Sequence, residues 1–180
     1  MLLNGFRRNQ GPSSVFRCFI NTQPLADALR GNKSVEKLVL YGEHSSEDLS
    51  YMFCALAGNI GLKALSLADI PLDDESWSIM CHSLVLHPAL EELSLDMTAS
   101  HDATSQISEI SDYGFEMATA RLTRRSRALA EMVEVNTGLR SVYWADEECD
   151  TLIIDNDVYP RLEMNEYRFR VAAMRKPGGA

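Results

Sequence analysis

Side chains that could do acid–base, metal or nucleophilic chemistry are scattered along this chain and form no known motif. His82 and His87 are five residues apart, so they would not share a helix face as metal ligands at i and i+4 do. Cys149 stands between Glu148 and Asp150, and nearby negative charge raises a thiol pKa, which opposes use as a nucleophile. The sequence has no phosphate-binding glycine loop, no H-E-x-x-H, no C-x-x-C and no G-x-S-x-G. We therefore expect no catalytic residue, no metal site and no cofactor, and we predict that the chain is not an enzyme.

A short basic cluster is the next candidate for chemistry. It consists of Arg121, Arg124, Arg125 and Arg127. Such a cluster could grip phosphate, RNA or an acidic partner. The alternative is a solvated helix face whose arginines pair with neighbours such as Glu131. We favour the second interpretation because the cluster lacks the interleaved aromatic residues of nucleic-acid binders and the formal net charge is −9. The expected partner is therefore not a nucleic acid.

The elements that position these side chains come from an internal repeat. In residues 55–67 its skeleton is Leu56, Asn59, Leu62, Leu65 and Leu67, at spacings of three, three, three and two. The same skeleton occurs three more times: Leu29, Asn32, Val35, Leu38, Leu40; Leu84, His87, Leu90, Leu93, Leu95; and Val133, Asn136, Leu139, Val142, Trp144. Four copies with one spacing indicate a repeat architecture.

Each copy predicts a helix end, a turn and a strand. Apolar residues four and three positions before the first leucine, such as Met52 and Phe53, give one apolar helix face. The asparagine should end the helix in the left-handed conformation that this residue tolerates, with a glycine beside it, as Gly58 lies beside Asn59. Alternation then resumes at the strand period. Stacked units should form a parallel sheet with all helices on one side.

This pattern resembles leucine-rich repeats of the ribonuclease-inhibitor type, A-L-x-x-N-x-x-L-x-x-L-x-L, with units of about 28 residues. The spacing here is 27 residues from Leu29 to Leu56 and 28 from Leu56 to Leu84. The family usually places Asn or Cys three residues after its last leucine. This chain has Glu43, Ile70, Thr98 and Glu147 at that position. We therefore expect the buried asparagine ladder to be absent or replaced, with irregular turns after the strands.

The resemblance implies an α/β leucine-rich-repeat solenoid of about five units, with a curved parallel sheet and helices on the convex side. Repeats should occupy residues 1–147, followed by a helical cap over 148–173 and a flexible tail over 174–180. Leu84 and Val133 are 49 residues apart, so we expect an insertion at about 98–113, before a helix over 114–135. We favour a solvated loop for this insertion, and the alternative is a functional flap over the binding face. The first unit starts midway. Either the chain is a fragment of a longer protein, or a partner covers the bare end, self-association being one such case.

The candidate binding residues point outward from the strands on the concave face. They are Lys37, Val39, Tyr41, Ser66, Glu92, Ser94, Asp96 and Tyr143. Tyrosine and tryptophan are common anchors of protein interfaces. We predict a protein–protein interaction module, with a partner that carries a basic patch opposite Glu92 and Asp96. The alternative is a substrate-recognition repeat segment of a larger protein, such as a ligase or a secreted effector.

Length and composition indicate the number of domains and the cellular location of the chain. At 180 residues it is long enough for one domain. No run of 18 apolar residues or export signal is visible, so we expect no membrane span and a cytoplasmic location. The four cysteines, Cys18, Cys54, Cys81 and Cys149, have no metal-like spacing, and we interpret them as reduced thiols that mostly fill the core. Cys54 and Cys81 fall in the predicted repeat helices.

Overall fold

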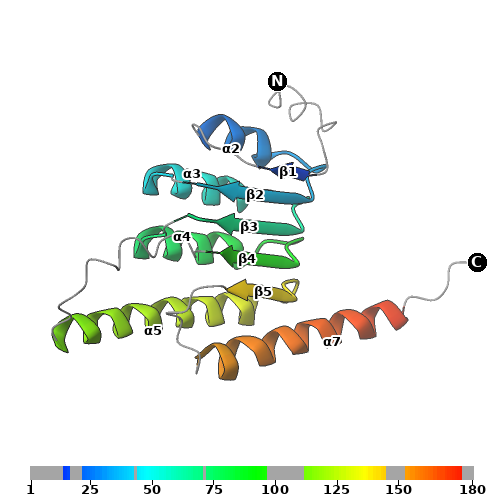
Figure 1. Ribbon diagram of the computed structural model, residues 1–180. Coiled ribbons are helices and arrows are strands. Elements are labelled where there is room, and N and C mark those ends of the chain that lie inside the picture. The colour runs from blue at the N-terminus through cyan, green and yellow to red at the C-terminus, as the bar shows by residue number, and fades with distance from the viewer. Residues whose placement is uncertain are drawn as a thin grey trace, which may run out of the picture.

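The fold was examined in a computed structural model that describes residues 14–16, 22–42, 44–70, 72–96, 112–144 and 153–175. Strands and helices alternate along the chain (Figure 1). The strands are β1 (Ser14–Phe16), β2 (Lys37–Tyr41), β3 (Ala64–Ala68), β4 (Glu92–Asp96) and β5 (Ser141–Trp144). The helices are α2 (Thr22–Arg30), α3 (Ser46–Leu56), α4 (Asp74–Leu84), α5 (Asp112–Val135), the π-helical turn η2 (Ile154–Val158) and α7 (Tyr159–Arg175).

The sheet is parallel and its spatial order β1-β2-β3-β4-β5 follows the sequence. The register places Leu38 opposite Leu65, Leu65 opposite Leu93, and Leu93 opposite Val142, so the predicted skeleton positions align from unit to unit. Each helix from α2 to α5 packs on the next. The predicted leucine-rich-repeat solenoid with a parallel sheet is confirmed.

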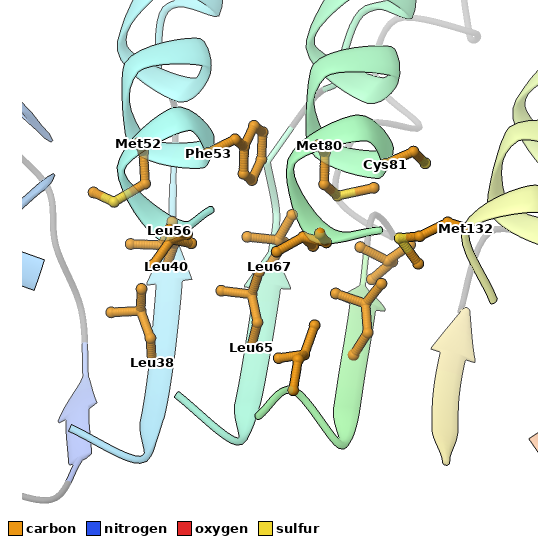
Figure 2. Packing of buried hydrophobic residues seen from close by; sticks show 14 of the residues in the cluster. Leu38, Leu40, Met52, Phe53, Leu56, Leu65, Leu67, Met80, Cys81 and Met132 are labelled. Carbon is orange, nitrogen blue, oxygen red and sulfur yellow. The ribbon is translucent and has the colours of Figure 1, made fainter. Parts of the chain in front are cut away.

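The core lies between the sheet and the helices (Figure 2). Leu38 and Leu40 of β2, like Leu65 and Leu67 of β3, are fully or almost fully buried. Helix residues at the predicted apolar positions cover them, among them Met52, Phe53, Leu56, Met80, Cys81 and Leu84. Because strand side chains alternate, burial of every second residue turns the intervening ones toward the opposite face of the sheet.

Polar caps fix where two of the helices begin. The Ser45 hydroxyl accepts a hydrogen bond from the Asp48 backbone N–H at 3.2 Å, and the Asp73 carboxylate accepts one from the Ser76 N–H at 2.7 Å. The Ser46 hydroxyl donates to the same Asp73 carboxylate, which joins the N-terminal ends of α3 and α4. These hydrogen bonds lower the pKa of the Asp73 carboxyl group to about 2, and the bond from Ser46 contributes most.

The repeat asparagines do not adopt the left-handed conformation, contrary to the prediction. In the described part of the chain, positive φ values occur at Gly42 (96°) and Asp69 (54°), both directly after strands. Asn59 instead uses its side chain: its Oδ1 accepts hydrogen bonds from the N–H groups of Gly61 (2.9 Å) and Leu62 (2.8 Å). The asparagine therefore ends the helix by binding the backbone of the following turn.

The same asparagines form a buried ladder between units, at a position other than the one after the last leucine, where the ladder was predicted to be absent or replaced. Asn59 Nδ2 donates to the carbonyls of Leu29 (2.6 Å) and Asn32 (2.9 Å) in the preceding unit. Asn136 donates to Leu84 and His87 in the same way. The ladder is therefore built at the helix-to-strand turn and does not depend on the position after the last leucine.

The C-terminal helix continues this ladder. Leu162 is buried, and Asn165 Nδ2 donates to the carbonyls of Asn136 (3.2 Å) and Leu139 (2.9 Å). Three positions later, where other units have leucine or valine, stands Arg168, and α7 continues as helix to Arg175. The α7 helix thus begins a further unit and contributes no strand.

The region of the predicted insertion differs slightly from expectation. Helix α5 begins at Asp112, two residues before the predicted start at 114, so residues 112 and 113 are helical. The rest of the predicted 98–113 loop lies outside the described residues, as do residues 1–13, on which the self-association prediction rests, and residues 176–180 of the predicted tail.

Candidate protein-binding surface

The sheet face opposite the helices is the surface for which sequence analysis predicted binding, and we call it the open face. Its members are the outward strand residues Lys37, Val39, Tyr41, Ala64, Ser66, Ala68, Glu92, Ser94, Ser141 and Tyr143, with Asp96 at the end of β4. Those with described side chains are exposed or half-buried, whereas their strand neighbours Leu38, Leu65 and Leu93 are buried. These strands belong to one sheet, in which they lie side by side (Figure 1).

The strand register sorts these residues into rows that run across the sheet. Val39 pairs with Ser66, Ser66 with Ser94, and Ser94 with Tyr143, which makes one row of four strands. Tyr41 belongs to the next row, where it pairs with Ala68. On the strands between the two tyrosines these rows contain the small side chains of Ser66, Ser94 and Ala68, so a partner could approach the backbone closely at the centre of the open face.

The two tyrosines are separate projections. Tyr41 is 38% exposed and Tyr143 is 58% exposed. They lie on β2 and β5, three strand spacings apart, which corresponds to roughly 15 Å. Two aromatic side chains at that distance can contact one partner at two points but cannot form a single cluster.

The charges of the open face are close together. Lys37 and Glu92 are both exposed and occupy one row, with Ala64 between them. Their strands are two spacings apart, about 10 Å. Asp96 pairs with Ala68 at the far end of β4, and its side chain lies outside the described set. This row therefore carries a positive group and a negative group on two units that are separated by the unit of β3.

Trp144, the last strand residue, packs inward. Its ring centroid lies 5.0 Å from that of Trp77, and Trp77 is buried. Trp77 Nε1 donates to the carbonyl of Arg125 at 3.1 Å. Trp144 thus belongs to the core between β5 and the helices, while its neighbour Tyr143 belongs to the open face.

Two arginines of the basic cluster on α5, Arg121 and Arg125, form ion pairs with α4. The sequence predicted pairing with neighbouring residues but not with this helix. Arg125 is buried, its Nε lies 2.9 Å from Asp74 Oδ1, and its guanidinium lies 5.5 Å from the Trp77 ring centroid. Arg121 pairs with the same carboxylate at 2.9 Å. Burial raises the pKa of Asp74, but the two arginines outweigh it and hold that pKa below its ordinary value. The partner of these arginines is the first turn of α4, a contact between units that residue spacing does not reveal.

The cysteines divide between core and surface. Cys81 is buried, and burial, aided by the Glu131 charge, raises the pKa of its thiol to about 12. Cys54 is exposed and therefore does not fill the core. The described residues contain no group of three His, Cys, Asp or Glu side chains that could hold a metal ion. No helix within the described ranges is long and apolar enough to cross a membrane.

Comparisons with known proteins place the fold. No protein-family model matches the sequence, and no curated protein matches it. Among solved structures, the chain is similar to leiomodin-1 actin-binding site 2, with a TM-score of 0.68 and 15% identity, over 97% of this chain and 94% of the other. It is also similar to the tropomodulin C-terminal domain of Caenorhabditis elegans, with a TM-score of 0.64 and 17% identity, over 97% of both chains.

These structures correct the predicted subclass. The repeat is of the leucine-rich type, but the similar structures are tropomodulin and leiomodin domains, so the resemblance to the ribonuclease-inhibitor type was wrong. The skeleton fixes a helix, an asparagine turn and a strand, and these features are not specific to one subclass. The chain departs from the ribonuclease-inhibitor pattern three residues after the last leucine of the strand, where Ile70 stands in place of Asn or Cys and is buried. At 15% and 17% sequence identity, the similarity to these structures shows the fold alone.

Proposed function

We propose that this chain is a non-enzymatic protein-interaction module of the cytoplasm and that its partner is actin. The observation that carries the proposal is the fold shared with leiomodin-1 actin-binding site 2 over nearly the full length of both chains. The buried, high-pKa Cys81 thiol and the core role of Arg125 agree with a binding module, since both side chains are used for packing.

The open face is the binding surface that we propose. Tyr41 and Tyr143 are exposed aromatic side chains, and exposed tyrosines are typical interface anchors. Between them the small side chains of Ser66 and Ser94 leave room for a partner. Glu92 and Asp96 favour a basic patch on the partner, because complementary charge aids encounter and orientation.

Co-sedimentation with actin filaments tests both parts of the proposal. The wild-type chain should pellet with filaments in a concentration-dependent way. The Tyr41→Ala/Tyr143→Ala variant should keep its fold, since exposed substitutions change stability by about 0.5 kcal/mol. Its affinity should fall at least about tenfold if the tyrosines are anchors.

A matched control replaces two exposed tyrosines elsewhere. Tyr159→Ala/Tyr167→Ala alters α7, where both side chains are exposed, and should bind as the wild type does. Absence of filament and monomer binding by the wild-type chain would reject actin as the partner. Binding that survives the Tyr41/Tyr143 change but not the control change would reject the open face as the site.

A further inference from the structure

A second surface lies at the positions that directly precede the ladder residues of the last three units. Large apolar side chains project there from three successive units: Leu86 is 79% exposed, Val135 53% and Met164 50%. We call Leu86, Val135 and Met164 the turn rim. It is distinct from the open face, because Leu86 lies in the turn after α4, Val135 ends α5 and Met164 lies within α7, so that none of them belongs to a strand.

The rim residues are aligned by the ladder beneath them. Leu86, Val135 and Met164 directly precede His87, Asn136 and Asn165 in the sequence. Asn136 Nδ2 lies 3.5 Å from the His87 carbonyl, and Asn165 Nδ2 lies 3.2 Å from the Asn136 carbonyl. Adjacent rungs are therefore in hydrogen-bond contact, which places the preceding apolar side chains in one row across the units.

The strand side of the rim is electrically neutralised. Lys63 Nζ lies 2.8 Å from Glu36 Oε1, Arg140 is paired with Glu91, and its other nitrogen lies 3.3 Å from Glu166 Oε2. These five residues alternate in sign from one unit to the next. Because they satisfy one another, this border offers little net charge to a partner.

The helix side of the rim is acidic. Glu131 and Glu163 are exposed there without a cationic partner among the ion pairs of the described residues, whereas Glu134 is paired with Arg161 at 3.2 Å. Arg168, one helical turn beyond Met164, bounds the far end of the row. The rim thus has an apolar centre, one neutral border and one negative border.

We propose that the turn rim docks a basic amphipathic helix of a partner protein. A helix that crosses the units can place side chains at i, i+4 and i+7 on successive rim residues, since four residues rise about 6 Å and stacked units are about 5–10 Å apart. Lysine or arginine on one flank of that helix would face Glu131 and Glu163. Anionic lipid is disfavoured, because the same glutamates repel it.

The first experiment uses a labelled synthetic peptide of leucine and lysine, about 14 residues long, with leucines at i, i+3, i+4 and i+7. A second peptide has the same leucines with glutamate in place of lysine. Fluorescence anisotropy should show saturable binding of the leucine–lysine peptide, at least about tenfold tighter than the leucine–glutamate peptide. Methyl NMR should show shifts at Leu86, Val135 and Met164 on titration.

The variant Leu86→Ser/Val135→Ser/Met164→Ser removes the rim at exposed positions, and its melting curve verifies that it folds. Its affinity for the leucine–lysine peptide should fall at least about tenfold, while the Tyr41→Ser/Tyr143→Ser control should bind as the wild type does. Single changes at each rim position serve if the triple variant does not fold. Equal binding of both peptides, unchanged affinity after loss of the rim, or tighter binding to phosphatidylglycerol vesicles than to the peptide would overturn the proposal.

Discussion

Asn59 and His87 occupy the same position in neighbouring units, but their side chains form different sets of hydrogen bonds. Both side chains accept two backbone hydrogen bonds from the turn that follows: Asn59 Oδ1 at 2.9 and 2.8 Å, His87 Nδ1 at 3.3 and 3.1 Å. Asn59 also donates to two carbonyls of the preceding unit. His87 does not, because its Nε2 is buried and has no hydrogen-bond partner.

This difference in hydrogen bonding distinguishes two roles of the side chain at the ladder position of the repeat. The acceptor role, which ends the helix and shapes the turn, is retained in both units. The donor role, which joins one unit to the one before it, is present at Asn59 and lost at His87. The neighbouring turn residue differs too: Gly61 is backed against the Lys33 backbone, and Ala89 occupies the same position after His87. The unit that begins at β4 is therefore joined less tightly at its turn.

The largest expected effect comes from removing the complete rung. Asn59→Ala removes the acceptor of the Gly61 and Leu62 N–H groups and the donor to the Leu29 and Asn32 carbonyls, of which the Leu29 carbonyl keeps its bond from the Asn32 N–H. Each unsatisfied group costs about 1–3 kcal/mol, partly relieved by relaxation, so the free energy of unfolding should fall by about 3–5 kcal/mol. Urea denaturation measures it. Asn59→Asp, which keeps the acceptors and loses the donor, is the informative control, and a loss below about 1 kcal/mol in Asn59→Ala would show that the ladder is not a structural requirement.

The next effect tests the close approach at Gly61. A Cβ built there would lie 2.7 Å from the carbonyl carbon of Lys33, a backbone atom that cannot move aside without shifting the unit. Gly61→Ala should therefore lower the free energy of unfolding by about 1–3 kcal/mol, as overpacking does. Ala89→Gly is the reciprocal change and should cost less than about 1 kcal/mol. Equal effects of the two changes would remove the proposed difference between the turns.

Most of the fold could be predicted from the sequence because its repeat is periodic. The spacing of Leu56, Leu62, Leu65 and Leu67 fixes a helix end, a turn and a strand, and these local elements have one way to stack. The asparagine ladder was missed because its donors bind carbonyls 27 and 30 residues away, as Asn59 does. Sequence spacing shows that an asparagine recurs but not which backbone groups its amide reaches.

The candidate surfaces were only partly predictable. Alternation placed Tyr41 and Tyr143 on the outward side of their strands correctly, since strand period is a local property. The turn rim was not predicted, although Leu86, Val135 and Met164 each precede a ladder residue in the sequence. Their exposure depends on the side-chain direction at the turn, which the skeleton does not specify.

A smaller gain is expected when the incomplete rung is restored. His87→Asn keeps an acceptor for Ala89 and Leu90 and adds a donor that can reach the preceding unit. It also removes a buried nitrogen without a partner, so the free energy of unfolding should rise by about 1–2 kcal/mol. Thermal and urea denaturation measure the change. A loss of stability would mean that the imidazole fills volume that the shorter amide cannot, and the comparison with Asn59 would then concern packing.

The smallest expected effect is a pH dependence that belongs to His87. Burial lowers the pKa of its imidazole below 6.5, and a proton on Nδ1 would remove the acceptor that Ala89 and Leu90 use. As pH falls through 6.5, the unfolded chain binds a proton that the folded chain does not, so stability is present above that pH and is lost below it. Between about pH 7.5 and 5.8 the loss should reach at most about 1 kcal/mol. Carboxylates and other histidines titrate as well, so the measurement is the difference between wild type and His87→Asn across that range. A constant difference would assign the pH dependence to other groups, whereas a difference that grows as pH falls would identify His87 as the point where this solenoid is sensitive to acid.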